Sequence, residues 1–519
     1  MKLIKNMFKT LLILIGILAM VALFGFAIMM IFHVSLFGYT YVKYDNDAQI
    51  EFAKEQVDTL TTIDLTTTRA NVVIAYTSQS TAKSMLVSNL QNFQGIFKDT
   101  VKRVGYTDPN SEEKKPGYKL KIENGVLKIE TIEPDGLYLV NDNKIKIYLP
   151  QNKLLTDLKI NSGAKVIDIG ENKNFTVQNL TILANKSILP NNVTISDKLT
   201  VQGDLTLKTN LGKITINSTI NGNVNINSNA GSITFNTNVA GNVNVSGKSP
   251  AVEFGHLPMD LKFNNDFDIS DVKQYNILGN LVIDNCSGAG NVKVSGTVNG
   301  YVYIYNPDIE FWARNVNNSI TCQGGANNIR VFGKLDGITS TINCGNGYLY
   351  LNNTYSVVNA ESTMNSVEIK NARNDVTINN TRGDIVVQFA DGVTKKLVAT
   401  TQTGSIKATN LRGEAKLTAN GGNVTASFEN VTGNSEIKAK YRANVTIADN
   451  ITYNFTARAK TATVNVQLGS VIYKNWNDAE NIDGWKTKTN VINYNGSSPS
   501  NSLTVSVTDN GSITAKMPD

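Results

Sequence analysis

Apolar residues recur at every second position over long parts of this chain. In the stretch "NGNVNINSNAGSITFNTNVAGNVNVSG" (221–247), valine, isoleucine and phenylalanine alternate with residues that are mostly asparagine. A period of two is typical of β-strands with one buried face, although asparagine is normally depleted from strands. The pattern therefore predicts an all-β chain of short strands, in which asparagine has a role that an isolated strand does not give it.

The alternating segments follow one another at a regular spacing. The motif Gly-x-Φ-x-Φ, in which Φ is apolar, first recurs every nine or ten residues, and alternate copies resemble each other most. The motif begins at Gly203, Gly212, Gly222, Gly231, Gly241, Gly290, Gly300, Gly347, Gly383, Gly404, Gly422 and Gly511. The spacing predicts a repeat of nineteen residues with two short strands, each closed by a Gly or Asn turn that accepts positive φ.

Short strands with tight turns fit either an antiparallel sandwich or a parallel β-helix, a β-solenoid of stacked repeats. The period is sustained over hundreds of residues and the same residue types return at the same phase, which favours the β-solenoid. In stacked repeats equivalent side chains lie about 4.8 Å apart, so asparagine amides can form hydrogen-bonded ladders. Biased genome composition is a competing cause of the high Asn content, but it does not explain the fixed phase.

The start of the chain is apolar rather than alternating. Residues 11–32, "LLILIGILAMVALFGFAIMMIF", contain no charged side chain and match the roughly 20 residues needed to cross a bilayer. A cleaved signal peptide is the alternative, although its apolar core is shorter. Lysines precede the segment, so the positive-inside rule places residues 1–10 in the cytoplasm and the remainder outside the cell as a single-pass membrane protein.

The regions around the repeats are less regular. We expect a juxtamembrane tether over 33–69 and a β-solenoid ectodomain over 70–519, with its first strand at "NVVIAYTS" from Asn71. Residues 80–117 are expected to form a helix and loop, as an insertion or cap, because Leu86, Leu90, Phe93, Phe97 and Val101 recur at helical spacing. Residues 473–501 break the period and are expected to be an irregular insertion or a second cap.

Composition narrows the classes of partner. The net charge of +6 includes Lys2, Lys5 and Lys9, so the rest of the chain is only weakly basic and nucleic acid is not expected as a partner. The three cysteines are an odd number for an exported domain, which argues against a disulfide framework. Ile320-Thr-Cys322 and Ile342-Asn-Cys344 are twenty-two residues apart, so we expect these thiols to point inward on neighbouring repeats.

The sequence offers little catalytic chemistry, and no catalytic, cofactor-binding or metal-binding residue is predicted. His33 lies at the edge of the apolar segment, and His256 is interpreted as a turn residue. Asp266, Asp268 and Asp271 form an acidic cluster that lacks the glycine of the twelve-residue calcium loop. "STAK" (80–83) matches Ser-x-x-Lys without the companion motifs of that enzyme class.

Tyrosine replaces asparagine at the outward positions of two repeats. The candidate binding residues are Tyr301, Tyr303, Tyr305, Tyr348 and Tyr350. The two segments are forty-seven residues apart, about two repeats plus a loop, so they are expected to share one face as an aromatic patch. Tyrosine combines a flat apolar ring with a polar tip, which suits sugar rings or a protein partner. The alternative is that Phe311 and Trp312, or a nearby strand pair, cover these rings.

One segment resembles a known family. "NKIKIYLPQNKLLTDLKINSGAKVIDIG" (143–170) is followed by recurrent Gly-[Asp/Ser/Asn]-[Ile/Val] strands and by "LTVSVTDNGSITAKM" (503–517). This order is similar to that of the bacterial putative-adhesin domain family, over roughly residue 71 to the end of the chain. The resemblance implies a β-solenoid-like, membrane-anchored surface protein and adds no ligand and no catalytic residue.

Two functions remain open from the sequence. The first is a non-enzymatic, membrane-anchored cell-surface protein that acts as an adhesin or structural surface-binding protein for a glycan, a surface polymer or a surface protein. The second is a polysaccharide-acting enzyme, a lyase or hydrolase, on the same scaffold. Carboxylates or basic residues aligned on one outward face would favour the enzyme, whereas the outward positions are chiefly Asn, Thr, Lys and Tyr.

Overall fold

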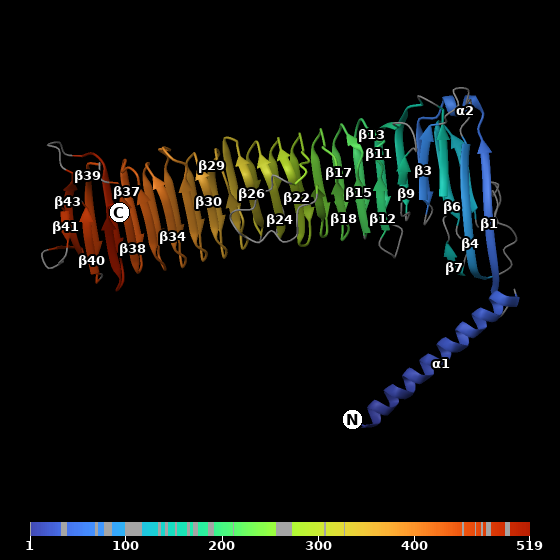
Figure 1. Cartoon of the computed structure of the whole chain (residues 1–519), viewed down its shortest axis with the longest axis horizontal. Helices are drawn as coiled ribbons and strands as arrows, with labels where there is room; N and C mark the ends of the chain where they lie inside the picture. Colours follow the sequence, from blue (N-terminus) through green and yellow to red (C-terminus); the bar gives the residue numbers. More distant parts are fainter. Residues whose placement is uncertain are drawn as a thin grey trace. The chain divides into compact units, whose positions relative to one another are not determined.

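A computed structural model of the whole chain is shown in Figure 1. The structure describes residues 2–32, 39–67, 71–76, 86–98, 117–132, 136–140, 144–150, 153–162, 167–169, 175–184, 191–210, 212–255, 272–305, 308–325, 327–448, 451–461, 463–468, 471–473, 479–493 and 499–518. The chain divides into two compact units, 1–218 and 219–519, and each is described by itself.

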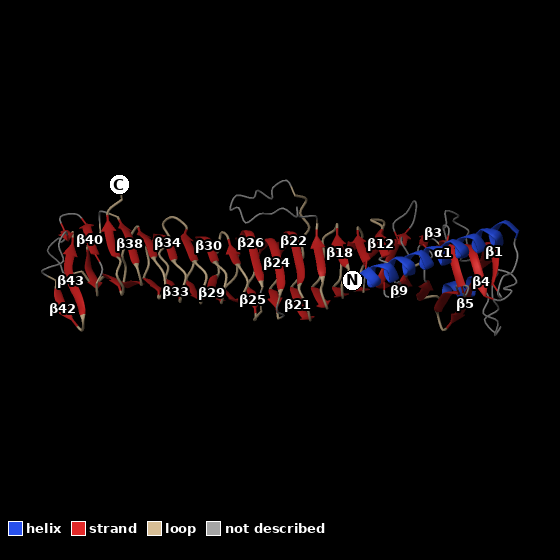
Figure 2. Ribbon diagram, turned by 90° about the horizontal axis from the view of Figure 1, so that it is seen from below, coloured by secondary structure: helices blue, strands red, loops and turns tan. Residues whose placement is uncertain are grey.

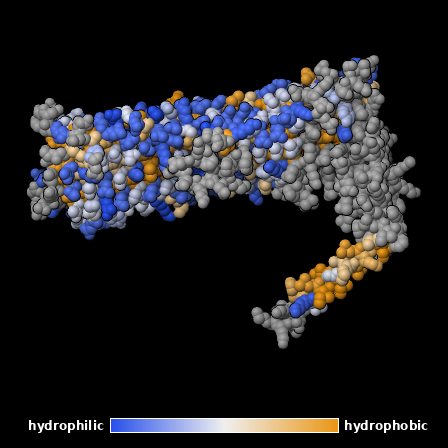
Figure 3. Space-filling model, in the orientation of Figure 1, coloured by the Kyte–Doolittle hydropathy of each residue, from blue (hydrophilic) through white to orange (hydrophobic). Residues whose placement is uncertain are grey.

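The first unit begins with an apolar helix, α1 (Lys2–Phe32). Its segment Phe8–Gly25 is long and apolar enough to cross a membrane, a property that membrane anchors and signal sequences share. The described side chains of this segment are largely exposed, and the helix stands out as apolar in Figure 3. Exposure of so much apolar surface to water is unfavourable.

The remainder of the first unit consists of strands and one short helix, α2 (Lys54–Asp58). The first set of strands is β1 (Tyr39–Glu51), β3 (Asn71–Tyr76), β4 (Leu86–Lys98), β7 (Gly136–Val140), β8 (Lys144–Leu149), β10 (Ile167–Ile169), β12 (Asn191–Ile195) and β15 (Gly212–Ile216). In this set β4 pairs with β1, β7 and β8. From β8 the pairing continues through β3, β10 and β12 to β15. The second set is β2 (Thr62–Thr67), β5 (Gly117–Glu123), β6 (Val126–Ile132), β9 (Leu155–Ser162), β11 (Phe175–Ala184), β13 (Leu199–Val201) and β14 (Leu205–Thr209). Its strands pair in the order β5, β6, β2, β9 and β11. Strand β11 also pairs with both β13 and β14.

Two sequence predictions for this unit are wrong. The segment predicted as a helix from the spacing of Leu86 to Phe97 is instead the thirteen-residue strand β4. The region 33–69, predicted as a tether, contains β1, α2 and β2. The physical reason is the same for both, since β1 and β4 pair antiparallel along their whole length and satisfy each other's backbone groups. Val101 lies outside the described residues.

The second unit is an array of short strands that alternate between two sheets. The first sheet contains β18 (Ser232–Phe235), β20 (Ala251–Phe254), β22 (Gly290–Val298), β24 (Ile309–Val316), β26 (Asn328–Leu335), β28 (Leu349–Leu351), β30 (Val367–Ala372), β32 (Ile385–Phe389), β34 (Ile406–Leu411), β36 (Val424–Phe428), β38 (Arg442–Ile447), β40 (Thr463–Leu468), β41 (Val471–Tyr473) and β45 (Ser512–Lys516). The second sheet contains β16 (Thr219–Ile220), β17 (Val224–Ser228), β19 (Val243–Gly247), β21 (Leu281–Cys286), β23 (Val302–Ile304), β25 (Ile320–Cys322), β27 (Thr339–Asn343), β29 (Val357–Ser362), β31 (Val376–Asn380), β33 (Leu397–Thr401), β35 (Ala415–Ala419), β37 (Asn434–Ala439), β39 (Tyr453–Ala459), β42 (Glu480–Ile482), β43 (Trp485–Ile492) and β44 (Ser502–Val507).

Pairing in this unit follows the predicted two-strand repeat. Strand β17 pairs in parallel with β19, and β18 pairs in parallel with β20; in both pairs the partners are nineteen residues apart. Figure 2 shows the strands of the two sheets as two rows linked by loops. We call one consecutive pair of strands, one from each sheet, a rung. Apolar side chains alternate inward, and like residues stack on like, as in the parallel rings of Phe235 and Phe254, whose centroids are 4.5 Å apart.

Asparagine side chains connect successive rungs, as the fixed phase predicts. On the outer face of the second sheet, Asn244 Nδ2 donates to Asn225 Oδ1 at 2.9 Å. At the turn before the strand, the backbone N–H of Asn242 donates to Asn223 Oδ1 at 2.9 Å, and that of Asn280 donates to Asn242 Oδ1 at 2.8 Å. These bonds satisfy polar groups that a simple strand ladder leaves open, and so they stabilise the stack.

Gly212 adopts the positive φ that was predicted for the turns, at 117°, but other repeat glycines have a different role. Gly241 and Gly300 do not adopt positive φ. Instead, a Cβ atom on Gly241 would lie 2.5 Å from the carbonyl oxygen of Gly222, and one on Gly300 would lie 2.5 Å from that of Gly279. Glycine is therefore required here because the backbones of neighbouring rungs approach closely at the turn.

The chain does not add its last rung in sequence order. Strand β44 pairs in parallel with β37 on one side and with β39 on the other, and β45 lies in the same way between β38 and β40. The C-terminal segment is thus inserted between two rungs that precede it in the sequence, and Figure 1 marks the C-terminus among these strands. Within 473–501, β43 pairs antiparallel with β39, and β42 with β43.

Candidate binding surface

The candidate surface lies on the outer face of the second sheet, around β23. Val302 and Ile304 point into the core and are fully buried. The strand alternation therefore turns Tyr301, Tyr303 and Tyr305 outward. The side chains of Tyr301 and Tyr305 are each 41% exposed, which is the arrangement predicted for this segment.

The three tyrosines form a parallel row along the strand. The ring centroids of Tyr301 and Tyr303 are 5.9 Å apart, as are those of Tyr303 and Tyr305, and the ring planes are inclined by 25° and 12°. Inserting another ring between two of them would need roughly 7 to 8 Å, twice the optimal carbon–carbon separation. A ligand therefore cannot enter between the rings, so it must contact their outer edges, their hydroxyl groups or the end rings.

The row crosses a column of uncharged outward residues, which we call the neutral strip. Neighbouring strands pair so that these residues are aligned from β17 to β33: Asn225, Asn244, Val282, Tyr303, Thr321, Thr341, Asn359, Thr377 and Val398. None of them is buried. Charge begins only beyond the strip, where Val398 is followed by Lys416 and then by Glu436.

Charged side chains flank the neutral strip: Asp284 and Glu361 on one side, and Asp375 and Lys396 on the other. Asp375 Oδ1 accepts the backbone N–H of Lys396 at 2.8 Å, and the other two carboxylates are each held by an amide. Asp284, which follows Ile283 on β21, accepts a hydrogen bond from Asn285 Nδ2 at 3.1 Å. Glu361 on β29 accepts one from Asn343 Nδ2 at 3.2 Å. These bonds partly satisfy the three carboxylates locally, which limits their availability to a ligand.

Tyr348 and Tyr350 do not belong to this surface, so the prediction of a single aromatic patch is wrong. They lie at β28, which pairs with β26 and β30 in the first sheet, whereas β23 pairs with β21 and β25 in the second. The separation of forty-seven residues is close to two and a half repeats of nineteen, and the extra half repeat places the segments on opposite sheets.

The second tyrosine pair is largely enclosed. Tyr350 is only 7% exposed, and Tyr348 donates a hydrogen bond from its hydroxyl to Glu368 Oε2 at 2.8 Å. Burial and the neighbouring Glu368 carboxylate raise the pKa of Tyr348 well above its usual value. These rings are therefore part of the fold rather than a free surface.

A buried cluster of cations and aromatic rings lies beside them on the outer face of the first sheet. Trp312, 4% exposed, is flanked by Lys293 Nζ at 4.5 Å and by Arg330 Cζ at 4.6 Å from its ring centroid. Burial lowers the pKa of Arg330, and Glu310, 4.0 Å away, opposes that shift. Val272 and Phe332 pack against Trp312, and the ring centroids of Phe332 and Tyr350 are 6.0 Å apart, so the Trp312 cluster adjoins the second tyrosine pair. The register of Lys293, Trp312 and Arg330 is visible only once the strands are aligned, which is why the sequence did not reveal the cluster.

All three cysteines are buried and free. Burial raises the pKa of Cys286 to about 11 and that of Cys322 to about 12. Cys322 and Cys344 face inward as predicted, but the register differs by two residues, because Cys322 is aligned with Ile342 rather than with Cys344. These thiols are packing groups, since a nucleophilic or metal-binding cysteine requires an accessible thiolate.

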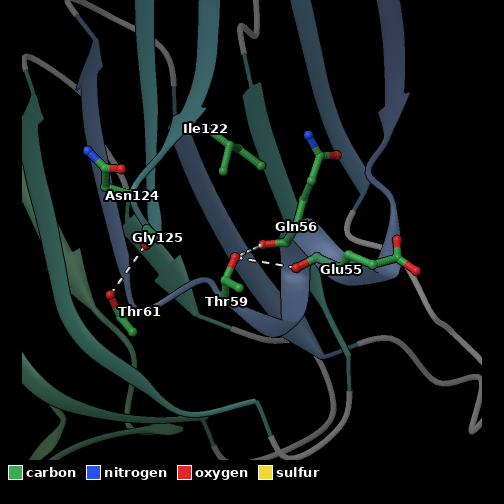
Figure 4. A pocket seen from close by; sticks show the side chains of 7 residues that line it. All are labelled: Glu55, Gln56, Thr59, Thr61, Ile122, Asn124 and Gly125. Atoms are coloured by element: carbon green, nitrogen blue, oxygen red, sulfur yellow. Dashed lines mark hydrogen bonds between the residues drawn. The ribbon is translucent and has the colours of Figure 1, made fainter.

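A shallow hollow with a volume of about 550 Å³ lies beside α2 in the first unit. Figure 4 shows its lining side chains, among which Thr59 Oγ1 donates to the backbone oxygens of Glu55 and Gln56 and Thr61 Oγ1 donates to that of Gly125. The hydroxyl protons are thus used within the fold, and the side chain of Glu55 is exposed. The polar side chains that line this hollow therefore do not point together at a position where a ligand could bind.

The remaining chemical candidates of the sequence analysis lie outside the described residues. These are His33, His256, the aspartates at 266, 268 and 271, and the Ser-x-x-Lys match at 80–83. Within the described ranges there is no group of three His, Cys, Asp or Glu residues placed to hold a metal ion.

Comparison with known proteins gives little further information. No protein-family model matches the chain, and no curated protein matches it. Among solved structures, a putative cell adhesion protein from Clostridium sporogenes is matched with 8% identity over 91% of this chain and 100% of that chain, at a TM-score of 0.14. A likeness at this level leaves the resemblance to the putative-adhesin family, over roughly residue 71 to the end of the chain, unconfirmed.

Proposed function

We propose that this chain is a membrane-anchored, cell-surface β-solenoid that acts non-enzymatically as an adhesin or structural surface-binding protein. The observation that carries the proposal is the exposed row of Tyr301, Tyr303 and Tyr305 on the neutral strip. Exposed aromatic rings on an otherwise polar surface are typical of recognition sites, because each ring buries a large area at a low cost in side-chain entropy.

The β-solenoid assignment is supported by the pairing of alternate strands. Parallel partners nineteen residues apart, with like residues stacked, are what a coil of two-strand rungs produces. Such a stack presents long outer columns at a fixed spacing, which suits an extended ligand or partner.

Anchorage is supported by the length and apolarity of α1. Residues 11–32 would span the bilayer, with the lysine-flanked N-terminus in the cytoplasm and the strands outside the cell. The expected partners are accordingly the membrane itself and a glycan, a surface polymer or a surface protein.

The test is a binding measurement on cells that display the full chain. Replacing Tyr301 and Tyr305 together with serine should reduce adhesion to other cells or to isolated surface material while the denaturation midpoint is unchanged. Tyr441→Ser is the matched control, because Tyr441 is 42% exposed elsewhere in the same unit.

Two other results would count against the proposal. Unchanged adhesion of the double variant would remove the tyrosine row from the function. Release of shortened polymer fragments by the purified protein would instead support the polysaccharide-acting enzyme.

A further inference from the structure

We infer that the neutral strip binds an uncharged glycan. This inference rests on the proposed surface-binding function and narrows it to one class of ligand. Three properties of the strip carry it: its charge, its hydrogen-bonding groups and the geometry of the tyrosine row.

The absence of charged side chains from the strip argues against a charged polymer as its ligand. Nine successive strands of the second sheet, β17 to β33, contribute no Asp, Glu, Lys, Arg or His side chain to this column. At about 4.8 Å per strand the column is roughly 38 Å long, enough for several sugar units. Polyanions are held by aligned Lys and Arg side chains, which this column does not have.

The hydrogen-bonding groups of the strip complement sugar hydroxyls. Amide and hydroxyl groups both donate and accept, as sugar hydroxyls do, and they carry no charge to desolvate. In the ladder, Asn244 uses one amide proton to reach Asn225 Oδ1, and an amide group has a second proton and acceptor lone pairs. Because the ladder fixes the amide orientation, little side-chain entropy remains to be lost on binding.

The tyrosine row supplies the apolar part of the site. Its parallel stacking turns both faces of Tyr303 toward Tyr301 and Tyr305, and each end ring keeps one face directed away from the row. The end faces and the three hydroxyl groups are the parts that a sugar can contact. Tyr303 thus acts as a positioning residue, and Tyr301 and Tyr305 are the contact residues.

The experiment measures binding of the full-length protein, in detergent micelles, to three polysaccharide classes. The neutral probes are a β-glucan and a mannan, the anionic probes are hyaluronate and heparin, and chitosan is the cationic probe. We expect the neutral probes to bind with a Kd that does not change between low and high salt. Tyr301→Ser with Tyr305→Ser should weaken this binding by about tenfold, and Tyr441→Ser should not change it.

A pair of opposite charges introduced at one position tests the ligand class independently. Thr321 is aligned with Tyr303 in the strip, so we compare Thr321→Lys with Thr321→Glu. An uncharged ligand should lose affinity to a similar extent in both variants. Opposite shifts, one stronger and one weaker, would show that the ligand is charged and would overturn the inference.

The remaining outcomes separate the inference from the proposed function. If only anionic or cationic probes bind, or if cell adhesion persists without binding to any polysaccharide, the glycan class is wrong and the surface-binding function stands. If the protein binds neither polysaccharides nor cells, both fail. Thermal unfolding of every variant identifies any that lose binding because they are misfolded.

Discussion

At the scale of the residue, asparagine has three different roles in the second unit. Asn225 and Asn244 connect rungs through their side chains, and Asn223 accepts the backbone N–H of Asn242. Asn371, by contrast, adopts φ of 50°, at a shift in the register between β30 and β32. The side-chain ladders were predictable from the phase of the repeat. The left-handed conformation of Asn371 was not, because this residue lies within a strand at a bulge, which changes the alternation locally and leaves no distinct sequence mark.

A repeat glycine gives the first prediction at this scale. Gly241→Ala should destabilise the protein by about 1–3 kcal/mol, because its Cβ would overlap the carbonyl group of Gly222 in the neighbouring rung. The shift in the urea denaturation midpoint measures the effect. Thr425→Ala, at an exposed outward position of β36, is the control and should leave the midpoint nearly unchanged. An unchanged midpoint for Gly241→Ala would show that the rungs do not approach as closely as described.

The buried thiols give a second prediction. Below the ordinary thiol pKa of 9.0, the folded protein should react very slowly with a maleimide, and the unfolded protein rapidly, as measured by mass spectrometry. Because the pKa values of Cys286 and Cys322 are raised in the folded state, their contribution to stability is complete below about pH 9 and is lost as the pH rises through 11 and 12. Fast labelling of folded Cys322 and Cys344 would mean that these residues face solvent.

At the scale of the element, pairing partners determined the secondary structure of a segment whose sequence pattern fits both a helix and a strand. In the segment 86–98, the steps from Leu86 to Leu90 and from Phe93 to Phe97 are even, and so they fit a strand as well as a helix. The step of three between the two pairs favoured a helix, but β4 obtains backbone partners from β1, β7 and β8, which lie elsewhere in the sequence. By contrast, the alternating apolar residues of 143–170 indicate strands, and β8, β9 and β10 lie in this segment. The sequence pattern was sufficient to predict a strand where neighbouring repeats supply its pairing partners. It was insufficient where the partners come from distant segments of the chain.

The inserted C-terminal strands give a prediction about stability. Ending the chain at residue 501 removes β44 and β45, so β39 and β40 lose the strands that join them to β37 and β38. We expect residues beyond about 448 to become sensitive to limited proteolysis, while the preceding rungs remain resistant. Removing only 517–519, which follow β45, is the control and should have no effect. Equal resistance of both proteins would show that β39 and β40 are held by other contacts.

At the scale of the whole molecule, the period of the repeat predicts which residues face outward but not which sheet carries them. Tyr301 to Tyr305 are exposed as expected, but Tyr348 and Tyr350 lie on the other sheet and are enclosed. The forty-seven residues between the two segments are close to two and a half repeats of nineteen, whereas counting them as two repeats plus a loop placed both segments on one sheet. The residues of the neutral strip could each be predicted to face outward, whereas their alignment required the strand register.

Membrane topology gives a further prediction. With α1 inserted and its lysine-bearing end in the cytoplasm, protease added to intact cells should degrade the region beyond Tyr44. The fragments are followed by immunoblotting with an epitope tag at the C-terminus, and a cytoplasmic protein serves as the control for cell integrity. Complete protection of the tagged region until the cells are lysed would reverse the orientation.

The C-terminal insertion also has a consequence for the synthesis of the protein. Earlier rungs of the second unit can stack as they emerge, since the partner of each strand has already been made. The place between β37 and β39, however, is filled by β44, which follows both of these strands in the sequence. An incomplete chain therefore ends in unpaired strand edges, which expose backbone groups to proteases and to other chains. A chain that has not yet reached β44 and β45 is therefore expected to be more sensitive to proteases than a chain that contains them.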